Sequence, residues 1–181
     1  MSEKSKTAVV VIDMLNCYDH EDAESLLESA RSAVPAIGRL LERAREAGVT
    51  IVFVNDNFGD WTTGRSHLIE RTRECVGSEL IDPIAPSEDI PFLLKARHSA
   101  FYGTPLEYLL RAEDIDRVVL SGQATEQCIL YSALDAYVRH FEVVVPRDAV
   151  AHIDEDLAQA ALRMMESNMR AEIADADTVG F

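Results

Sequence analysis

Three side chains of different chemistry, Asp13, Lys95 and Cys128, each lie at or just past the end of a predicted β-strand. Asp13 ends the apolar run TAVVVID, Lys95 ends PFLLK, and Cys128 follows a strand at 118–122. In an open parallel sheet the ligand crevice lies outside the carboxyl ends of the strands, so we expect these side chains to meet there. A carboxylate can take a proton from a thiol while an ammonium stabilises both anions, and an activated thiolate suits acyl transfer.

Each residue also has an ordinary explanation when it is taken alone. Asp13 could cap a helix, Lys95 could be a solvated strand end, and Cys128 could be a small buried apolar residue. Cys128 falls in the first turn of the helix after its strand, where unpaired backbone N–H groups and the helix dipole favour the thiolate. Only the combination of the three residues predicts a nucleophilic active site.

The hydrophobic pattern alternates between strands and helices along the chain. Continuous β-branched runs, typical of buried parallel strands, predict six strands, at 7–13, 49–55, 91–95, 118–122, 142–146 and 171–174. Helical periodicity predicts helices at 22–47 with a break or kink at Pro35, at 66–74, from Thr104 and Pro105 onward, around Ile129, Ala133, Ala136 and Tyr137, and at 155–169. This alternation predicts an α/β fold, a doubly wound, mostly parallel six-stranded sheet with helices on both faces.

The chain length and composition fit one domain, at 7–181, after a short N-terminal tail, 1–6. The stretch 56–91 lacks a clear period and is interpreted as a long binding loop with a short helix. The net charge of -15 argues against a nucleic-acid partner, and no apolar run is long enough to cross a membrane. No signal peptide precedes the first strand, so a cytoplasmic location is expected. Three cysteines without paired zinc spacing predict neither a disulfide nor a structural zinc site.

Four sequence blocks carry a resemblance to a known family: VVVIDMLN (9–16), KARHSAFYGTPLEYLL (95–110), LSGQATEQC (120–128) and ALDAYVRHFEVVVPRDAVA (133–151). In order and spacing the chain resembles the isochorismatase-like cysteine hydrolases, which include nicotinamidase and N-carbamoylsarcosine amidohydrolase. The resemblance implies a catalytic triad of Asp13 as general base and acid, Lys95 as its electrostatic partner and Cys128 as nucleophile. It also implies a cis peptide between Gln123 and Ala124, an oxyanion hole formed by the backbone N–H groups of Ala124 and Cys128, and a homo-oligomer such as a dimer or tetramer.

The chain departs from the nicotinamidase pattern at the positions of its metal ligands. Asp56 is kept, but Phe58 stands at the first histidine position and Glu74, before Cys75, stands at the second. Zinc prefers imidazole and thiolate ligands, so we expect no metal and no other cofactor. Cys17 replaces an aspartate of the family pattern and is interpreted either as a second reactive thiol or as a buried cysteine on the pocket floor.

Candidate substrate-binding residues surround the expected site, because aromatic and polar side chains around a small cavity exclude water and favour planar carbonyl substrates. Arg97 could anchor a substrate carboxylate or form an ordinary ion pair, and Trp61 could be a lid, a subunit contact or a surface residue. The candidates are Asn16, Trp61, His98, Phe101, Thr125 and Tyr131.

The sequence thus predicts a hydrolase that cleaves the C–N bond of a small amide, carbamoyl or ureido compound through a thioester. Two alternatives remain open. One is a vinyl-ether hydrolase of the isochorismatase type, which would not depend on the thiol. The other is a non-catalytic α/β binding module, for which loss of a triad residue would be expected.

Overall fold

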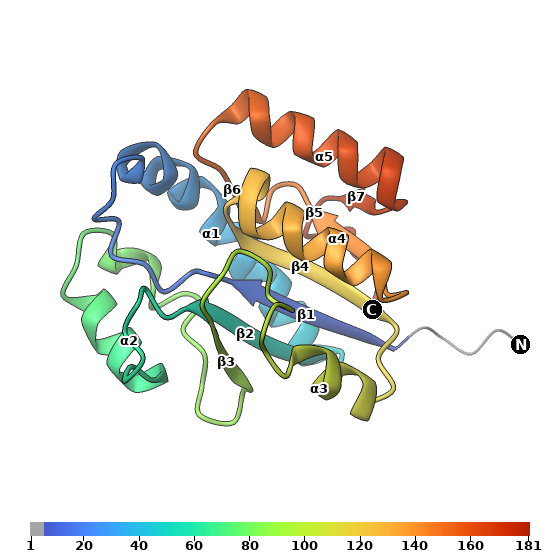
Figure 1. Cartoon of the computed structure of the whole chain (residues 1–181), viewed down its shortest axis with the longest axis horizontal. Helices are drawn as coiled ribbons and strands as arrows, with labels where there is room; N and C mark the ends of the chain where they lie inside the picture. The colour runs from blue at the N-terminus through green and yellow to red at the C-terminus, as the bar shows by residue number, and fades with distance from the viewer. Residues whose placement is uncertain (1–5) are drawn as a thin grey trace, which may run out of the picture.

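A computed structural model of the chain describes residues 6–181 and contains one seven-stranded sheet (Figure 1). The strand order is β3-β2-β1-β4-β5-β7, β6 pairs with β4, and the pairings are parallel. The strands are β1 (Thr7–Ile12), β2 (Thr50–Asp56), β3 (Phe92–Lys95), β4 (Arg117–Gln123), β5 (Glu142–Pro146), β6 (Val150–Ala151) and β7 (Glu172–Ala174). Apart from Lys6, the predicted tail lies outside the described residues.

Six of these strands are the predicted ones, with bounds that differ by at most one residue at either end. The count of six was wrong because β6 was missed. This strand has only two residues, which pair with Gly122 and Gln123 of β4. A two-residue strand is too short to show the alternating pattern by which strands are recognised in a sequence.

Helices cover both faces of the sheet, which confirms the doubly wound α/β fold. Helix α1 (Ala23–Glu46) packs on one face against Val9 and Val11, and these two residues share their hydrophobic core with the apolar side of the helix. The other face, with Ala8, Val10 and Ile12, is covered by three helices (Figure 1). They are α3 (Leu106–Ala112), α4 (Leu130–Val138) and α5 (Glu155–Met169). Because β1 is buried on both sides, its sequence is continuously apolar.

Details of the helices differ from the predictions. Pro35 lies inside α1 without ending it. The segment Thr125–Ile129, which carries Cys128, is one turn of π-helix that leads into α4. Tyr137 is 40% exposed, so of the apolar positions predicted for this helix only Ile129 in the π-helical turn and Ala133 and Ala136 in α4 are buried. In the irregular stretch after β2 lie α2 (Arg65–Arg73) and a 3-10 turn, Ser78–Leu80.

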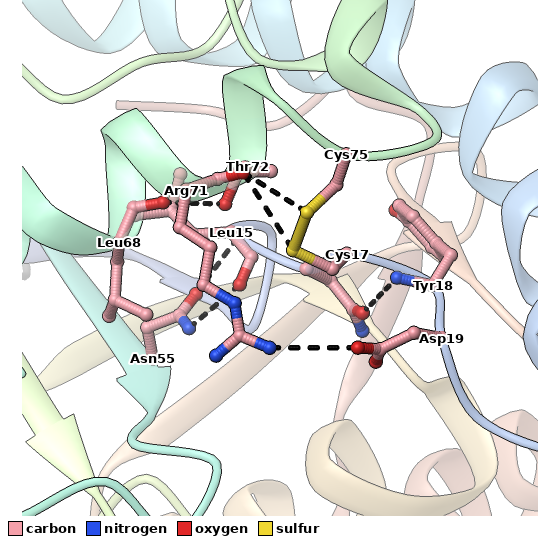
Figure 2. The surroundings of a disulfide bond; sticks show 10 residues. Leu15, Cys17, Tyr18, Asp19, Asn55, Leu68, Arg71, Thr72 and Cys75 are labelled. Atoms are coloured by element: carbon pink, nitrogen blue, oxygen red, sulfur yellow. Dashed lines mark hydrogen bonds and ion pairs between the residues drawn. A yellow bond between two sulfur atoms is a disulfide. The ribbon is translucent and has the colours of Figure 1, made fainter.

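A disulfide joins Cys17 to Cys75, which corrects the prediction of no disulfide and both interpretations of Cys17 (Figure 2). The two residues are 58 positions apart, and their Cα atoms lie 5.1 Å apart, within the range that a disulfide can bridge. Cys17 belongs to the loop after β1, and Cys75 follows α2. An odd number of cysteines did not exclude one pair, because this pairing depends on how the fold brings two distant loops together.

The loop after β1 is also held by polar contacts beside the disulfide (Figure 2). The Leu15 N–H donates to Asn55 Oδ1 at 2.9 Å, and the Asn55 amide donates to the Leu15 carbonyl at 3.1 Å. Arg71 of α2 forms an ion pair with Asp19 at 3.5 Å. The loop is therefore fixed to both β2 and α2.

No helix within residues 6–181 combines the length and the apolar character needed to cross a membrane.

Candidate active site

The carboxyl ends of three strands bring Asp13, Lys95 and Cys128 together. Lys95 ends β3, Asp13 follows β1, and Cys128 lies in the π-helical turn after β4. The Lys95 Nζ atom lies 2.8 Å from Asp13 Oδ2 and donates a longer hydrogen bond, 3.7 Å, to Cys128 Sγ. The negative charge of the Asp13 carboxylate also acts on the Cys128 thiol and raises its pKa. The three side chains thus form one contiguous polar group that is buried.

Asp56, at the end of β2, is a fourth member of this group. Its Oδ2 lies 3.3 Å from Lys95 Nζ, and its backbone N–H donates to Asp13 Oδ1 at 2.7 Å. The sequence pointed to Asp56 only as a metal ligand, so this ion pair was not predicted. Its position at the carboxyl end of a central strand is the signal that could have placed it beside Lys95.

Strand β4 fixes the backbone of Asp13. Gly122 pairs with Ile12, the residue before Asp13, and the Gln123 amide donates to the Asp13 carbonyl at 2.7 Å. The Tyr18 hydroxyl donates to Gln123 Oε1 at 3.2 Å, and burial raises the pKa of this hydroxyl to about 12, so it stays a donor. Asp13 adopts a left-handed conformation, φ 57°, which aspartate tolerates better than most residues.

The turn after β4 begins with a cis peptide bond between Gln123 and Ala124. The Ala124 carbonyl then accepts hydrogen bonds from the N–H groups of Gln127 and Ile129, at 3.0 and 3.1 Å. Glu126 ties this turn to the segment before α5, because its Oε1 accepts from Ile153 N–H at 2.8 Å. These contacts hold Cys128 in place.

Burial governs the protonation of the site. Desolvation raises the pKa of Asp13, although the ammonium of Lys95 opposes this. Desolvation also raises the pKa of the Cys128 thiol, and the negative charge of Asp13 raises it further. For Lys95 desolvation lowers the pKa, but the surrounding anions outweigh it and the pKa is raised. Burial and the negative charge of Asp13 therefore favour the neutral form of the Cys128 thiol, whereas its position at the start of a helix favours the thiolate.

The neutral thiol makes stability depend on pH in the alkaline range. A raised native pKa means that, above about pH 8.5, the unfolded chain loses the Cys128 proton while the folded chain keeps it. The free energy of unfolding should therefore fall as the pH rises from 8 to 10.5. In Cys128→Ser this slope should be shallower by up to about 1.4 kcal/mol per pH unit. Urea unfolding of both proteins across this range measures the difference, and equal slopes would contradict the buried neutral thiol.

A cavity of about 340 Å³ opens beside the cluster. It is lined by Asp13, Asn16, His20, Asp22, Leu26, Asp56, Phe58, His98, Gln123, Ala124, Gln127, Cys128 and Ile153. Of the predicted substrate-binding residues, Asn16 and His98 lie here. The Nδ1 atom of His98 is 3.9 Å from Cys128 Sγ. His20 and Asp22 were missed, although they belong to the loop after β1, which the strand-end argument already placed at this edge.

The other four predicted binding residues lie elsewhere. Tyr131 does not line the cavity but stacks on His98, with ring centroids 5.4 Å apart. Trp61 is 81% exposed and lines a different cavity. Phe101 is buried in the core against Phe141, and the Thr125 hydroxyl donates to the Ala151 carbonyl at 2.9 Å. Neither Phe101 nor Thr125 reaches the cavity, because each faces its own packing partner.

The positions that would correspond to metal ligands do not fit a metal ion. The Asp56 carboxylate is held by Lys95 and by the Phe58 N–H, which donates to its Oδ1 at 2.7 Å. Phe58 supplies no donor atom, and Cys75, next to Glu74, is in the disulfide. At these positions Asp56 therefore forms an ion pair with Lys95, and Cys75 forms a disulfide with Cys17.

Comparisons with known proteins agree with this architecture. Residues 7–178 match the isochorismatase domain. The chain is 31% identical to the uncharacterized isochorismatase family protein YaaI of Bacillus subtilis, over 97% of both chains. It is 27% identical to the ureidoacrylate amidohydrolase RutB of Agrobacterium fabrum, over 87% of this chain and 81% of that protein.

Among solved structures, the N-carbamoylsarcosine amidase of Thermoplasma acidophilum superimposes with a TM-score of 0.76. It is 31% identical, and the match covers 97% of this chain and 99% of that one. The chain therefore belongs to the isochorismatase family, and it is a hydrolase related to enzymes that act on carbon–nitrogen bonds other than peptide bonds.

Proposed function

We propose that this protein is a cysteine hydrolase that cleaves the C–N bond of a small amide, carbamoyl or ureido substrate through a thioester. The observation that carries the proposal is the position of Lys95 Nζ, 2.8 Å from Asp13 and 3.7 Å from Cys128, at the edge of a cavity. The names of relatives that act on ureidoacrylate and N-carbamoylsarcosine support the same bond type.

In the first half of the reaction Asp13 accepts the proton of Cys128 as the sulfur attacks the substrate carbonyl. The raised pKa of Asp13 suits it for accepting this proton, and Lys95 stabilises the anions that form. The backbone N–H groups of Ala124 and Cys128 hold the oxyanion, and each such donor contributes on the order of 3 kcal/mol in the transition state. Asp13 then passes the proton to the leaving nitrogen, and an amine or ammonia departs.

In the second half a water molecule hydrolyses the thioester. Asp13, again a carboxylate, takes a proton from the water, and the hydroxide adds to the thioester carbonyl. Collapse of the intermediate expels the Cys128 sulfur, which recovers the proton from Asp13. A carbamoyl or ureido substrate yields a carbamate, and an amide yields a carboxylic acid.

The test is release of ammonia or amine from a panel of small amides, carbamoyl compounds and ureas. Cys128→Ala should lower kcat by about 10³-fold or more, since the nucleophile is gone. Intact-mass spectrometry of the wild type during turnover should show an acyl adduct that Cys128→Ala lacks. Ser167→Ala is the control, because Ser167 is exposed on α5 and does not line the cavity. Retained hydrolysis in a folded Cys128→Ala protein would refute the mechanism.

A further inference from the structure

The cavity beside Cys128 carries more negative than positive charge. Three carboxylates line it, those of Asp13, Asp22 and Asp56. The Lys95 side chain is fully buried behind them, and its ammonium already contacts both Asp13 and Asp56. The single ammonium of Lys95 thus serves two carboxylates, and no lysine or arginine lines the cavity beside Asp22.

Within residues 6–181 no arginine or lysine lines this cavity, and the basic side chains in its lining are the imidazoles of His20 and His98. Arg71 is paired with Asp19 and lines a neighbouring cavity beside the disulfide (Figure 2). Arg97, which the sequence suggested as an anchor for a substrate carboxylate, is exposed and does not line the cavity. A bound carboxylate would therefore meet three carboxylates and no lysine or arginine, with the imidazoles of His20 and His98 as the basic groups in the lining.

From this charge distribution we infer that the cavity selects substrates whose non-reacting part is uncharged or cationic, and that it rejects substrates bearing a carboxylate. This inference rests on the proposed function and names its substrate class. A substrate carboxylate about 6 Å from one carboxylate of the cavity, at an effective dielectric constant of about 40, is repelled enough to lower the binding affinity about tenfold. This charge preference would distinguish the protein from the ureidoacrylate amidohydrolase among its relatives, because ureidoacrylate carries a carboxylate.

Cys128 provides a probe of this charge without any hydrolysis. It is the one free cysteine of the chain when Cys17 and Cys75 are paired. Methanethiosulfonate reagents transfer a thioalkyl group to a thiol, with release of methanesulfinate and a proton. Two such reagents differ in charge, one with a trimethylammonium-ethyl group and one with a sulfonatoethyl group. The rate of Cys128 modification by the cationic reagent is divided by the rate for the anionic reagent in the folded protein. Dividing this ratio by the same ratio for 2-mercaptoethanol corrects for the intrinsic reactivity of the two reagents and measures the charge preference of the cavity.

The normalised ratio should be about tenfold or more at low ionic strength and should fall as salt is added. Asp22→Asn should lower the ratio several-fold, and Asp22→Lys should lower it further. Asp22 suits this test because it is exposed and its side chain makes no capping hydrogen bond to α1. Glu21→Gln is the matched control, because it removes the same charge from the adjacent exposed residue outside the cavity lining.

Three results would overturn the inference: a normalised ratio near one or below, a Cys128 that reacts with neither reagent in the folded protein, or equal effects of Asp22→Asn and Glu21→Gln. The last result would show that only the net charge of the whole protein acts. Because labelling needs no turnover, its outcome is separate from the proposed function, which fails instead if Cys128→Ala still hydrolyses amides.

Discussion

Replacing Lys95 with methionine should lower the free energy of unfolding by about 3–5 kcal/mol near pH 7.5, because it leaves a buried carboxylate without its cation. The Lys95 side chain is fully buried and that of Asp13 is 10% exposed, so water cannot take the place of the ammonium. Asp13 and Asp56 would then repel each other across the vacated position. Hydrolysis should fall by about 10³-fold or more, because the anions of the reaction lose their partner. Urea unfolding and steady-state kinetics measure the two losses.

The electrostatic origin of this loss has its own signature. Protonating Asp13 removes the uncompensated charge, so the destabilisation of Lys95→Met should be smaller at pH 5 than at pH 7.5. The double variant Asp13→Asn/Lys95→Met should regain much of the stability at pH 7.5 but none of the activity. Lys6→Met is the control, because Lys6 is exposed and its ammonium donates to the Glu113 carbonyl, away from the site. A loss in Lys95→Met that is the same at both pH values would point to packing instead of charge.

Gly122→Ala should destabilise the protein by more than about 4 kcal/mol, a range reached only by severe steric or electrostatic faults. A Cβ atom at position 122 would lie 2.1 Å from the Ile12 carbonyl oxygen and 2.8 Å from the Ile12 nitrogen. Both atoms belong to the backbone of β1, so no side-chain rotation relieves the contact. Gly122 also has φ +115°, which L-residues rarely adopt. Thermal and urea unfolding measure this change.

The same substitution in α1 serves as the control. A Cβ on Gly38 would meet only the Pro83 carbonyl, at 3.8 Å, which is an ordinary contact. Because glycine is a poor helix former, Gly38→Ala should stabilise the protein by about 0.5–1 kcal/mol. A Gly122→Ala protein as stable as the wild type would contradict the close approach of Gly122 to the Ile12 backbone.

The meeting of Asp13, Lys95 and Cys128 could be anticipated because it follows from strand ends. A parallel sheet places the carboxyl ends of its strands at one edge, and apolar runs mark where strands end. The six longer strands and the helices on both faces follow from the same pattern. The resemblance added roles to these residues, and those roles stay proposals.

Other features depend on surroundings that the sequence does not reveal. The helix dipole favours a thiolate at Cys128, but desolvation and the Asp13 charge favour the neutral thiol, and the burial of a side chain can be known only from packing. The pairing of Cys17 with Cys75 needed the positions of two loops. Phe101 and Thr125 are close in sequence to site residues, yet their side chains point to the core and to a backbone carbonyl.

The disulfide also changes the chain when it is not folded. The bond closes a ring of nearly sixty residues that contains α1, β2 and α2, so the oxidised unfolded chain has fewer conformations than the reduced one. In the chain-entropy description, closing a ring of this size favours the folded state by about 4 kcal/mol. Much of the bond's contribution to stability would then come from this restriction. The same native contacts would be less stable wherever thiols are kept reduced.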